Sequence, residues 1–341
     1  MASLLLHILD AIFKRMPANG DIYAERKNNA ARRPPRPPRG VTVERTEFGG
    51  IPCEVVKKAG NTRIPVFYIH GGGFTTGSAR ERRAITFYLC DRFGFDCIAC
   101  DYRLAPEHKL PAAHEDCYAA YGAVVQRYPQ VVLMGESAGG TLAVSVAMRA
   151  LKEGIARPAA VAAFSPLAAL NTDLPSHKTN VKTDYMLKRD PSSGELLKLI
   201  CHENAGVEFF KDPIISPVYG TFNNFPPLFL SASDSEILYD DAVMLYQKAV
   251  NDGVKAHIEV MNGLLHAWPI ITQLPEARKT LKKLDVFLKM QAYSLRNFKR
   301  NNMKAINLKT EYLVNPIGID KKIPALCGTA RAEKSRRHTA L

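Results

Sequence analysis

Apolar and polar positions follow two rhythms along the chain, and these predict strands and helices in turn. Short, nearly continuous apolar runs bounded by Gly, Asn or Pro predict buried strands, which we expect at 41–48, 52–59, 64–70, 95–102, 131–136, 159–167, 226–233 and 256–263. Apolar residues at helical spacing predict helices at 81–94, 111–127, 138–154, 239–251 and 275–293. Strands that alternate with helices favour an α/β fold with a mostly parallel central sheet and helices on both faces.

Two regions fall outside this rhythm. Six apolar residues near the N-terminus recur at helical spacing: Leu4, Leu5, Ile8, Leu9, Ile12 and Phe13. We expect an amphipathic helix there, packed on the body and followed by a Pro/Arg-rich connector at 31–40. Residues 168–222 are polar, lack a clear buried strand and have the size of a helical cap insertion between two sheet strands. The predicted division is therefore a cap helix and connector (1–45), a main domain (46–295) that contains the insertion, and a basic C-terminal extension (296–341).

Composition and the position of the charge narrow the class of protein. Of the 341 residues, 46% are hydrophobic and 23% charged, which excludes a disordered chain, a collagen and a polytopic membrane protein. The formal net charge is +13, but residues 1–40 carry 8 basic and 3 acidic side chains and residues 295–341 carry 11 and 3. The remaining body holds 27 of each sign, so no nucleic-acid partner is expected.

Localisation and metal content follow from the apolar runs and the cysteines. No run approaches the roughly 20 apolar residues of a membrane span, and the N-terminal run lacks the basic start of a secretion signal. We therefore expect a cytoplasmic protein. The seven cysteines are odd in number, and Cys97 and Cys100 lie in an apolar run typical of a buried strand. The sequence indicates no disulfide framework, no metal site and no cofactor.

The segment with the clearest chemistry is 131–140, VVLMGESAGG. A buried strand runs into Gly-x-Ser-x-Gly and then into a helix rich in small residues, which is the context of a nucleophile elbow. The pattern points to Ser137 as a nucleophile at a helix N-terminus, where negative charge is favoured. A glycine-rich structural turn is the alternative.

A second glycine-rich segment, HGGGF at 70–74, follows another strand. Consecutive glycines expose backbone amides that a substrate oxygen can approach. Two of these amides, together with the amide of Ala138, would form an oxyanion hole. Neither of the common phosphate-binding glycine patterns is present.

A serine hydrolase also needs a base and an orienting acid. His266 lies just beyond the last predicted strand and fits the base, with a surface histidine as the alternative. For the acid, Asp234 and Glu236 both follow the strand at 226–233, and the residues alone leave the choice open. Asp240 and Asp241 lie at a helix start and are explained there as N-terminal charges.

These motifs resemble the hormone-sensitive-lipase family of α/β-hydrolases, through HGGGF, DYRLAPE (101–107) and GESAGG (135–140) in this order. The resemblance spans about 60–295 and implies an α/β-hydrolase fold with Ser137 as nucleophile, His266 as base, and Gly72, Gly73 and Ala138 as oxyanion donors. It places Glu236 in the register of the family's acid, thirty residues before the histidine, with Asp234 as the alternative.

The resemblance also implies how the remaining parts serve the site. The N-terminal segment and the 168–222 insertion fit the family's cap, which covers its catalytic domain. Four residues of the 101–107 segment are expected to brace the glycine loop: Asp101, Tyr102, Arg103 and Glu107.

The C-terminal extension does not resemble that family. Residues 303–341, with Glu311-Tyr312 and Asn315-Pro316-Ile317-Gly318-Ile319-Asp320, resemble the start of a bacterial α-L-rhamnosidase. We interpret the extension as appended, with a disordered basic tail as the alternative.

The sequence as a whole indicates a serine carboxylesterase that hydrolyses short-chain acyl esters, such as acetyl or butyryl esters, through an acyl-enzyme. A non-catalytic small-molecule receptor on the same fold and an acetyl-glycan deacetylase are the alternatives. The expected partner is a small-molecule ester. A homodimer is the oligomeric state that we consider for this protein.

Overall fold

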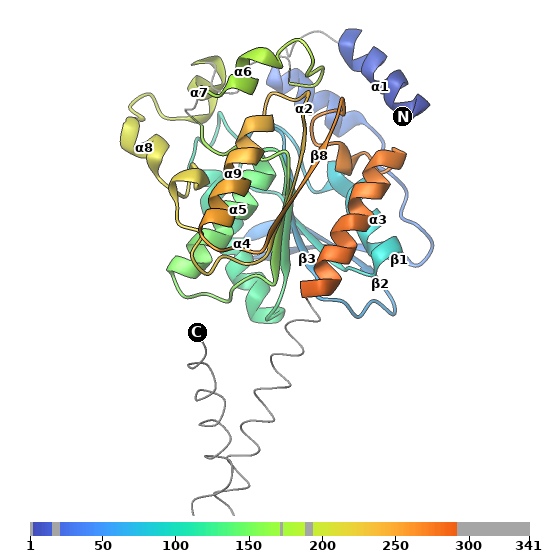
Figure 1. The fold of residues 1–341 in the computed structure, drawn as a ribbon. Helices are drawn as coiled ribbons and strands as arrows, with labels where there is room; N and C mark the ends of the chain where they lie inside the picture. Colours follow the sequence, from blue (N-terminus) through green and yellow to red (C-terminus); the bar gives the residue numbers. More distant parts are fainter. Residues whose placement is uncertain (1–2, 16–20, 171–172, 188–193, 292–341) are drawn as a thin grey trace, which may run out of the picture. The chain divides into compact units, whose positions relative to one another are not determined.

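The computed structural model describes residues 3–15, 21–170, 173–187 and 194–291. Its centre is an eight-stranded sheet in the order β1-β2-β4-β3-β5-β6-β7-β8 (Figure 1). The strands are β1 (Val41–Phe48), β2 (Ile51–Lys58), β3 (Val66–Ile69), β4 (Cys97–Cys100), β5 (Val132–Glu136), β6 (Ala160–Phe164), β7 (Leu228–Ser233) and β8 (Ala256–Met261). Strand β2 is antiparallel to β1 and β4, and all other pairs are parallel. The predicted mostly parallel sheet is confirmed.

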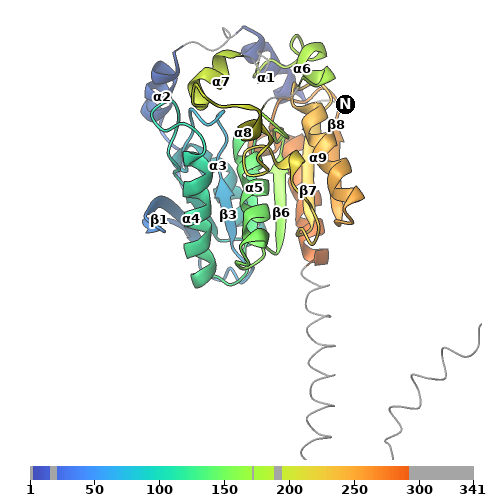
Figure 2. The same cartoon turned by 90° about the vertical axis from the view of Figure 1, so that its left-hand side faces the viewer.

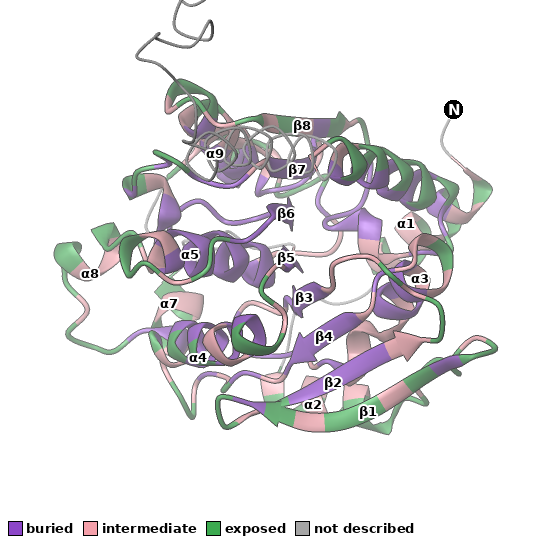
Figure 3. Ribbon diagram, turned by 90° about the horizontal axis from the view of Figure 1, so that it is seen from below, coloured by how far each residue is buried: buried purple, intermediate pink, exposed green. Residues whose placement is uncertain are grey.

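Helices cover both faces of this sheet (Figure 3). Helices α4 (Ala112–Arg127), α5 (Ala138–Lys152) and α9 (Tyr239–Asn251) lie on one face. Helix α3 (Arg83–Phe93), preceded by the 3-10 turn η1 (Arg80–Arg82), lies on the other together with a helix over residues 275–291. The strand residues alternate accordingly, since Phe67 and Ile69 join the first core cluster whereas Val66 and Tyr68 join the second.

Two segments were predicted outside the main domain, one before it and one after it. Helix α1 (Leu4–Arg15) is the predicted amphipathic helix, and its buried Leu6 packs with Leu264, Leu265 and Trp268. A second helix, α2 (Ile22–Ala31), was not predicted from the sequence. The predicted extension at 296–341, including its rhamnosidase-like part, lies outside the described residues.

Between β6 and β7 the described residues form short helices only. These are α6 (Pro175–Thr179), α7 (Gly194–Ile200), α8 (Val207–Lys211) and the 3-10 turn η2 (Pro217–Tyr219). Helices α1, α2, α6 and α7 gather at one end of the sheet (Figure 2). The parallel strands have their carboxyl ends there, because α1 packs on Leu264 and Leu265 beyond β8 and Arg26 of α2 binds the Thr75 carbonyl beyond β3.

The CxxC pair lies within β4, where both thiols are buried and free, so the buried-strand interpretation is confirmed. In the described part of the chain, no group of three or more His, Cys, Asp or Glu residues could hold a metal ion. The same residues include no helix long and apolar enough to cross a bilayer.

Candidate active site

Ser137 occupies the turn between β5 and α5. Its backbone lies at φ 54° and ψ −127°, which few L-residues adopt and which costs about 1–3 kcal/mol. The Ser137 amide donates a 2.8 Å hydrogen bond to the Phe164 carbonyl at the end of β6. The turn thus fixes Ser137 at the N-terminus of α5, as the nucleophile-elbow motif predicts.

The two glycines of the motif allow β3, β5 and α5 to approach closely. A Cβ on Gly139 would lie 2.2 Å from the Ile69 carbonyl oxygen, and a Cβ on Gly135 would lie 2.4 Å from the Gly139 carbonyl oxygen. Both distances are far below van der Waals contact, so only glycine fits at either position without moving the backbone.

The glycine loop, residues 70–74, lies beside Ser137. Strands β3 and β5 pair in parallel with Ile69 opposite Gly135, so the two loops leave the sheet at the same edge. A Cβ on Gly71 would lie 3.1 Å from the Ser137 Cβ. The predicted nucleophile and the predicted oxyanion loop are therefore neighbours.

Within the loop, Gly72 has φ 123°, and its carbonyl accepts hydrogen bonds from the amides of Thr75 (3.0 Å) and Thr76 (2.9 Å). This turn directs the carbonyl back into the loop. The amides of Gly72, Gly73 and Ala138 donate no hydrogen bond to any described residue. The three predicted oxyanion donors are therefore available to a ligand.

Glu136, directly before Ser137, is hydrogen-bonded to the glycine loop. Its buried carboxylate accepts hydrogen bonds from the Gly71 amide at 2.7 Å, the Tyr68 hydroxyl and the Arg82 guanidinium. The charge of Glu136 outweighs the partial burial of the Arg82 guanidinium, so the pKa of Arg82 is raised. The sequence analysis did not single out Glu136, whose only signal is its place inside Gly-x-Ser-x-Gly.

The residues expected to brace the glycine loop differ in what they contact. Tyr102 contacts the loop: it stacks on the His70 ring at 4.2 Å and donates a 2.8 Å hydrogen bond to the His70 carbonyl. Asp101 instead accepts the Ala79 amide at 2.6 Å, outside the loop. Burial lowers the pKa of His70 to about 3, so this ring is neutral at physiological pH. For Arg103 the expectation is wrong, because it pairs with Asp116 of α4.

Glu107 contacts the N-terminal helices. Its carboxylate forms an ion pair with Arg26 of α2, with 2.7 Å between the two atoms. Arg26 also donates to the carbonyls of Thr75, at 2.7 Å, and Ala105. One guanidinium therefore joins α2 to the residue after the glycine loop and to the 101–107 segment.

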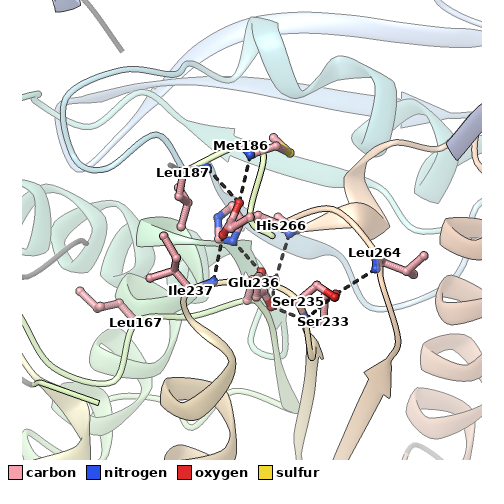
Figure 4. Close-up of polar contacts among 12 residues, drawn as sticks. Leu167, Met186, Leu187, Ser233, Ser235, Glu236, Ile237, Leu264 and His266 are labelled. Atoms are coloured by element: carbon pink, nitrogen blue, oxygen red, sulfur yellow. Dashed lines mark hydrogen bonds and ion pairs between the residues drawn. The ribbon is translucent and has the colours of Figure 1, made fainter. Parts of the chain in front are cut away.

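Glu236 and His266 form a buried pair, with Glu236 Oε2 2.7 Å from His266 Nδ1 (Figure 4). The second carboxylate oxygen, Oε1, accepts hydrogen bonds of 2.9 Å from the Ser165 hydroxyl and the Ser233 amide. Three hydrogen bonds therefore fix the carboxylate, and the one to Nδ1 orients the imidazole. His266 Nε2 is buried and has no hydrogen-bond partner among the described residues, Ser137 included.

Burial and pairing act in opposite directions on both groups. Burial raises the pKa of Glu236, and the hydrogen bond and charge of His266 offset this only in part. Burial disfavours the His266 imidazolium, yet the hydrogen bond and charge of Glu236, together with the charges of Asp184 and Glu136, outweigh burial, so the pKa of His266 is raised. The pair is thus arranged to stabilise a positive charge on the imidazole.

The alternative acid, Asp234, lies in a different environment. Its side chain is exposed, and its carboxylate accepts 2.9 Å hydrogen bonds from the Gly263 amide and the Ser235 hydroxyl. No contact joins Asp234 to His266 in the structure. Of the two predicted candidates, only Glu236 reaches the imidazole.

Ser165 connects the segments that carry Glu236 and His266, and the sequence analysis missed it. Its hydroxyl donates to Glu236 and accepts a 3.0 Å hydrogen bond from the amide of Ala267, next to His266. Ser165 lies directly after β6 at φ 49°. A small polar residue at the carboxyl end of a predicted parallel strand was the available signal.

Asp241 lies in the first turn of α9, as expected, but its role as a helix N-terminal charge is not its only one. The side chain is fully buried, and its carboxylate contacts His177 Nε2 of α6 at 2.6 Å and the Ala168 amide at 2.8 Å. Burial raises the pKa of Asp241, and His177 offsets part of that effect. This second His–carboxylate pair joins the insertion to α9.

Comparison with known proteins gives a consistent result. Residues 66–270 match a family described as the alpha/beta hydrolase fold. An acetyl-hydrolase of Streptomyces hygroscopicus is 32% identical over 249 residues, which cover 71% of this chain and 80% of that protein.

Two solved structures are similar over most of the chain. One is an esterase from the bacterial hormone-sensitive-lipase family, with a TM-score of 0.76 and 28% identity over 85% of this chain and 99% of that one. The other is an esterase whose crystals were soaked with p-nitrophenyl butyrate, with a TM-score of 0.75 and 29% identity over the same shares.

Proposed function

Because the chain belongs to the α/β-hydrolase fold family and is a carboxylic ester hydrolase of the hormone-sensitive-lipase type, we propose that Ser137, His266 and Glu236 form its catalytic triad. The observation that carries this assignment is the buried Glu236–His266 pair, which leaves Nε2 without a partner in the described part of the chain. A histidine held in this way can take a proton from a hydroxyl and later return it.

The proposed reaction has two acyl-transfer steps. His266 Nε2 removes the Ser137 hydroxyl proton as the oxygen attacks the ester carbonyl, and the amides of Gly72, Gly73 and Ala138 stabilise the oxyanion. The imidazolium then protonates the leaving alcohol. Water attacks the acyl-enzyme with the same base, which releases the carboxylic acid and restores Ser137.

We assign residues 1–45 and 168–222 to a cap over this site. The contacts of Arg26 with the segments around the glycine loop support the first part. The His177–Asp241 pair supports the second, because it fixes α6 to α9.

The proposed substrates are small, uncharged esters with a short acyl chain. The neutral body of the chain supports an uncharged substrate, because the excess of basic residues lies in the two ends. The relative named as an acetyl-hydrolase and the structural neighbour soaked with a butyrate ester support short acyl groups.

The test is hydrolysis of p-nitrophenyl acetate, butyrate, octanoate and palmitate by the wild type and by Ser137→Ala. We expect turnover concentrated on acetate and butyrate, and loss of at least about a thousandfold in kcat in the variant. Turnover that survives Ser137→Ala, or none from folded wild type, would overturn the triad. A preference for palmitate would overturn the chain-length proposal only.

A further inference from the structure

The insertion between β6 and β7 contacts the loop that carries Glu236 through side chain to main chain hydrogen bonds. We call residues 175–187 the cap segment and residues 234–238 the acid loop. Asn180 Nδ2 donates to the carbonyls of Asp234, at 2.8 Å, and of Glu236, at 2.9 Å. The Thr183 hydroxyl donates to the Ser235 carbonyl at 2.9 Å. Three consecutive carbonyls of the acid loop are therefore held by two side chains of the cap segment.

Asp184 makes the reverse contact, from an acceptor in the cap segment to a donor in the acid loop. Its Oδ2 accepts the Ile237 amide at 2.9 Å, and its Oδ1 accepts the amides of Met186 (3.0 Å) and Leu187 (2.9 Å) (Figure 4). The side chain is only 3% exposed. One carboxylate thus joins the residue after Glu236 to the turn at 184–187.

Only a carboxylate satisfies this arrangement. Three amide donors converge on the two oxygens of Asp184, whereas an asparagine would offer one oxygen and turn an NH2 group towards an amide. No lysine or arginine among the described residues forms an ion pair with Asp184. Its negative charge is therefore held by amide dipoles and remains available to nearby groups.

Three carboxylates act on the His266 imidazole from different elements. Glu236 acts from the acid loop by direct contact, Asp184 from the cap segment, and Glu136 from β5, where Arg82 pairs with it. All three raise the pKa of His266, and burial lowers it. Asp184 is the one whose charge belongs to the insertion.

We propose that Asp184 is a positioning residue of the esterase: it ties the cap segment to the acid loop at Ile237, holds Glu236 against His266, and adds a negative charge to those of Glu236 and Glu136 near the imidazolium. This proposal rests on the proposed catalytic roles of Glu236 and His266. It makes the insertion part of the machinery that sets the base, in addition to covering the site.

The experiment compares Asp184→Asn, Asn180→Ala and the control Asp173→Asn in the full chain. Asp173 is an exposed residue of the same insertion, paired with Lys178. The measurements are kcat and KM for p-nitrophenyl butyrate, the acid limb of the pH profile of kcat/KM, and Tm. Ser137→Ala and Glu236→Gln are assayed alongside, so that failure of the triad is recognised separately.

For Asp184→Asn we expect kcat to fall by between about tenfold and a hundredfold with KM little changed, because the proton-transfer geometry loosens. The acid limb should move to lower pH, since the imidazolium loses a negative neighbour. Asn180→Ala keeps the charge, so we expect a lower kcat with the limb unmoved. Asp173→Asn should match the wild type in all four measurements.

The outcomes separate the two proposals. If Glu236→Gln is inactive while Asp184→Asn keeps the wild-type kcat and acid limb, the positioning role of Asp184 is overturned and the triad stands. A lower Tm with an unchanged acid limb for Asp184→Asn would also overturn it, as a merely structural effect. If Asp184→Asn does not fold, wild-type kcat in Asn180→Ala overturns the proposal and a reduced kcat supports it.

Discussion

The Gly71 amide donates a 2.7 Å hydrogen bond to Glu136, which connects the glycine loop to the residue immediately before Ser137. The same carboxylate neutralises Arg82 and binds the Tyr68 hydroxyl. Nucleophile turn and glycine loop thus share one buried anion, and a change to that anion should affect both.

Glu136→Gln tests this connection. We expect loss of about 3 kcal/mol in the free energy of unfolding, because the partly buried Arg82 loses its charged partner. We also expect kcat to fall by between about tenfold and a hundredfold, as the oxyanion donors shift. Urea unfolding and p-nitrophenyl butyrate kinetics measure the two effects. Glu44→Gln, at an exposed pair with Lys57 on β1, is the control and should change neither.

Two single variants, Glu236→Gln and Asp234→Asn, decide between the two predicted acids. Only Glu236 contacts His266, so Glu236→Gln should lower kcat by about 10³–10⁴-fold, whereas Asp234→Asn should leave kcat near the wild-type value. Single-turnover kinetics with p-nitrophenyl acetate report the acylation step directly. Near-normal kcat in Glu236→Gln would contradict the assignment.

The pH dependence of kcat/KM should reveal the His266 pKa. Activity needs the neutral imidazole and therefore falls as pH drops through that pKa; since the pKa is raised above 6.5, the midpoint should lie above pH 6.5. Glu236→Gln removes the largest raising contribution, so any residual activity should have its midpoint at lower pH. Burial lowers the pKa of His70 and of His114 to about 3, so neither titrates in this range. A wild-type midpoint below pH 6 would count against His266 as base.

Gly139→Ala and Gly122→Ala should have opposite effects on stability. The added methyl at Gly139 would meet the Ile69 carbonyl at 2.2 Å, so we expect destabilisation of at least about 3 kcal/mol or failure to fold. At Gly122, within α4, nothing lies within 4 Å, and alanine should stabilise by up to about 1 kcal/mol through helix propensity. Thermal unfolding monitored by circular dichroism distinguishes these outcomes.

A chain that ends after residue 295 tests the predicted C-terminal extension. The compact unit that contains every site residue ends at Gln291, so we expect the shortened chain to fold and to keep its kcat and KM. Size-exclusion chromatography and ester hydrolysis are sufficient measurements. An insoluble or inactive product would show that the extension is required by the fold.

Local patterns made Ser137 and the glycine loop predictable. A strand, a Gly-x-Ser-x-Gly turn and a helix follow each other within about twenty residues, and each element shows its own periodicity. The contacts of Ser165 and Glu136 could not be predicted in the same way. Ser165 joins Glu236 and Ala267, 71 and 102 residues away in sequence, and periodicity carries no information on such pairs.

Helix α2 and Asp241 show two further limits. Helix α2 has no buried residue, so its apolar positions form no stripe that could reveal it. Asp241 satisfies the helix N-terminal preference for acidic residues, and this local explanation concealed its buried contact with His177, 64 residues earlier. A sufficient local reason for a charged residue does not exclude a tertiary one.

The contacts of Arg26 bear on how such a chain can diverge. Two of its three acceptors are main-chain carbonyls, of Thr75 and Ala105, which every amino acid supplies. Substitutions at positions 75 and 105 therefore leave both carbonyl acceptors in place. Arg80 adds contacts of the same kind at the other end of α2, to the carbonyls of Ala30 and Arg32. Selection can vary the side chains around the glycine loop for new substrates while these arginine-to-carbonyl hydrogen bonds preserve the attachment of α2.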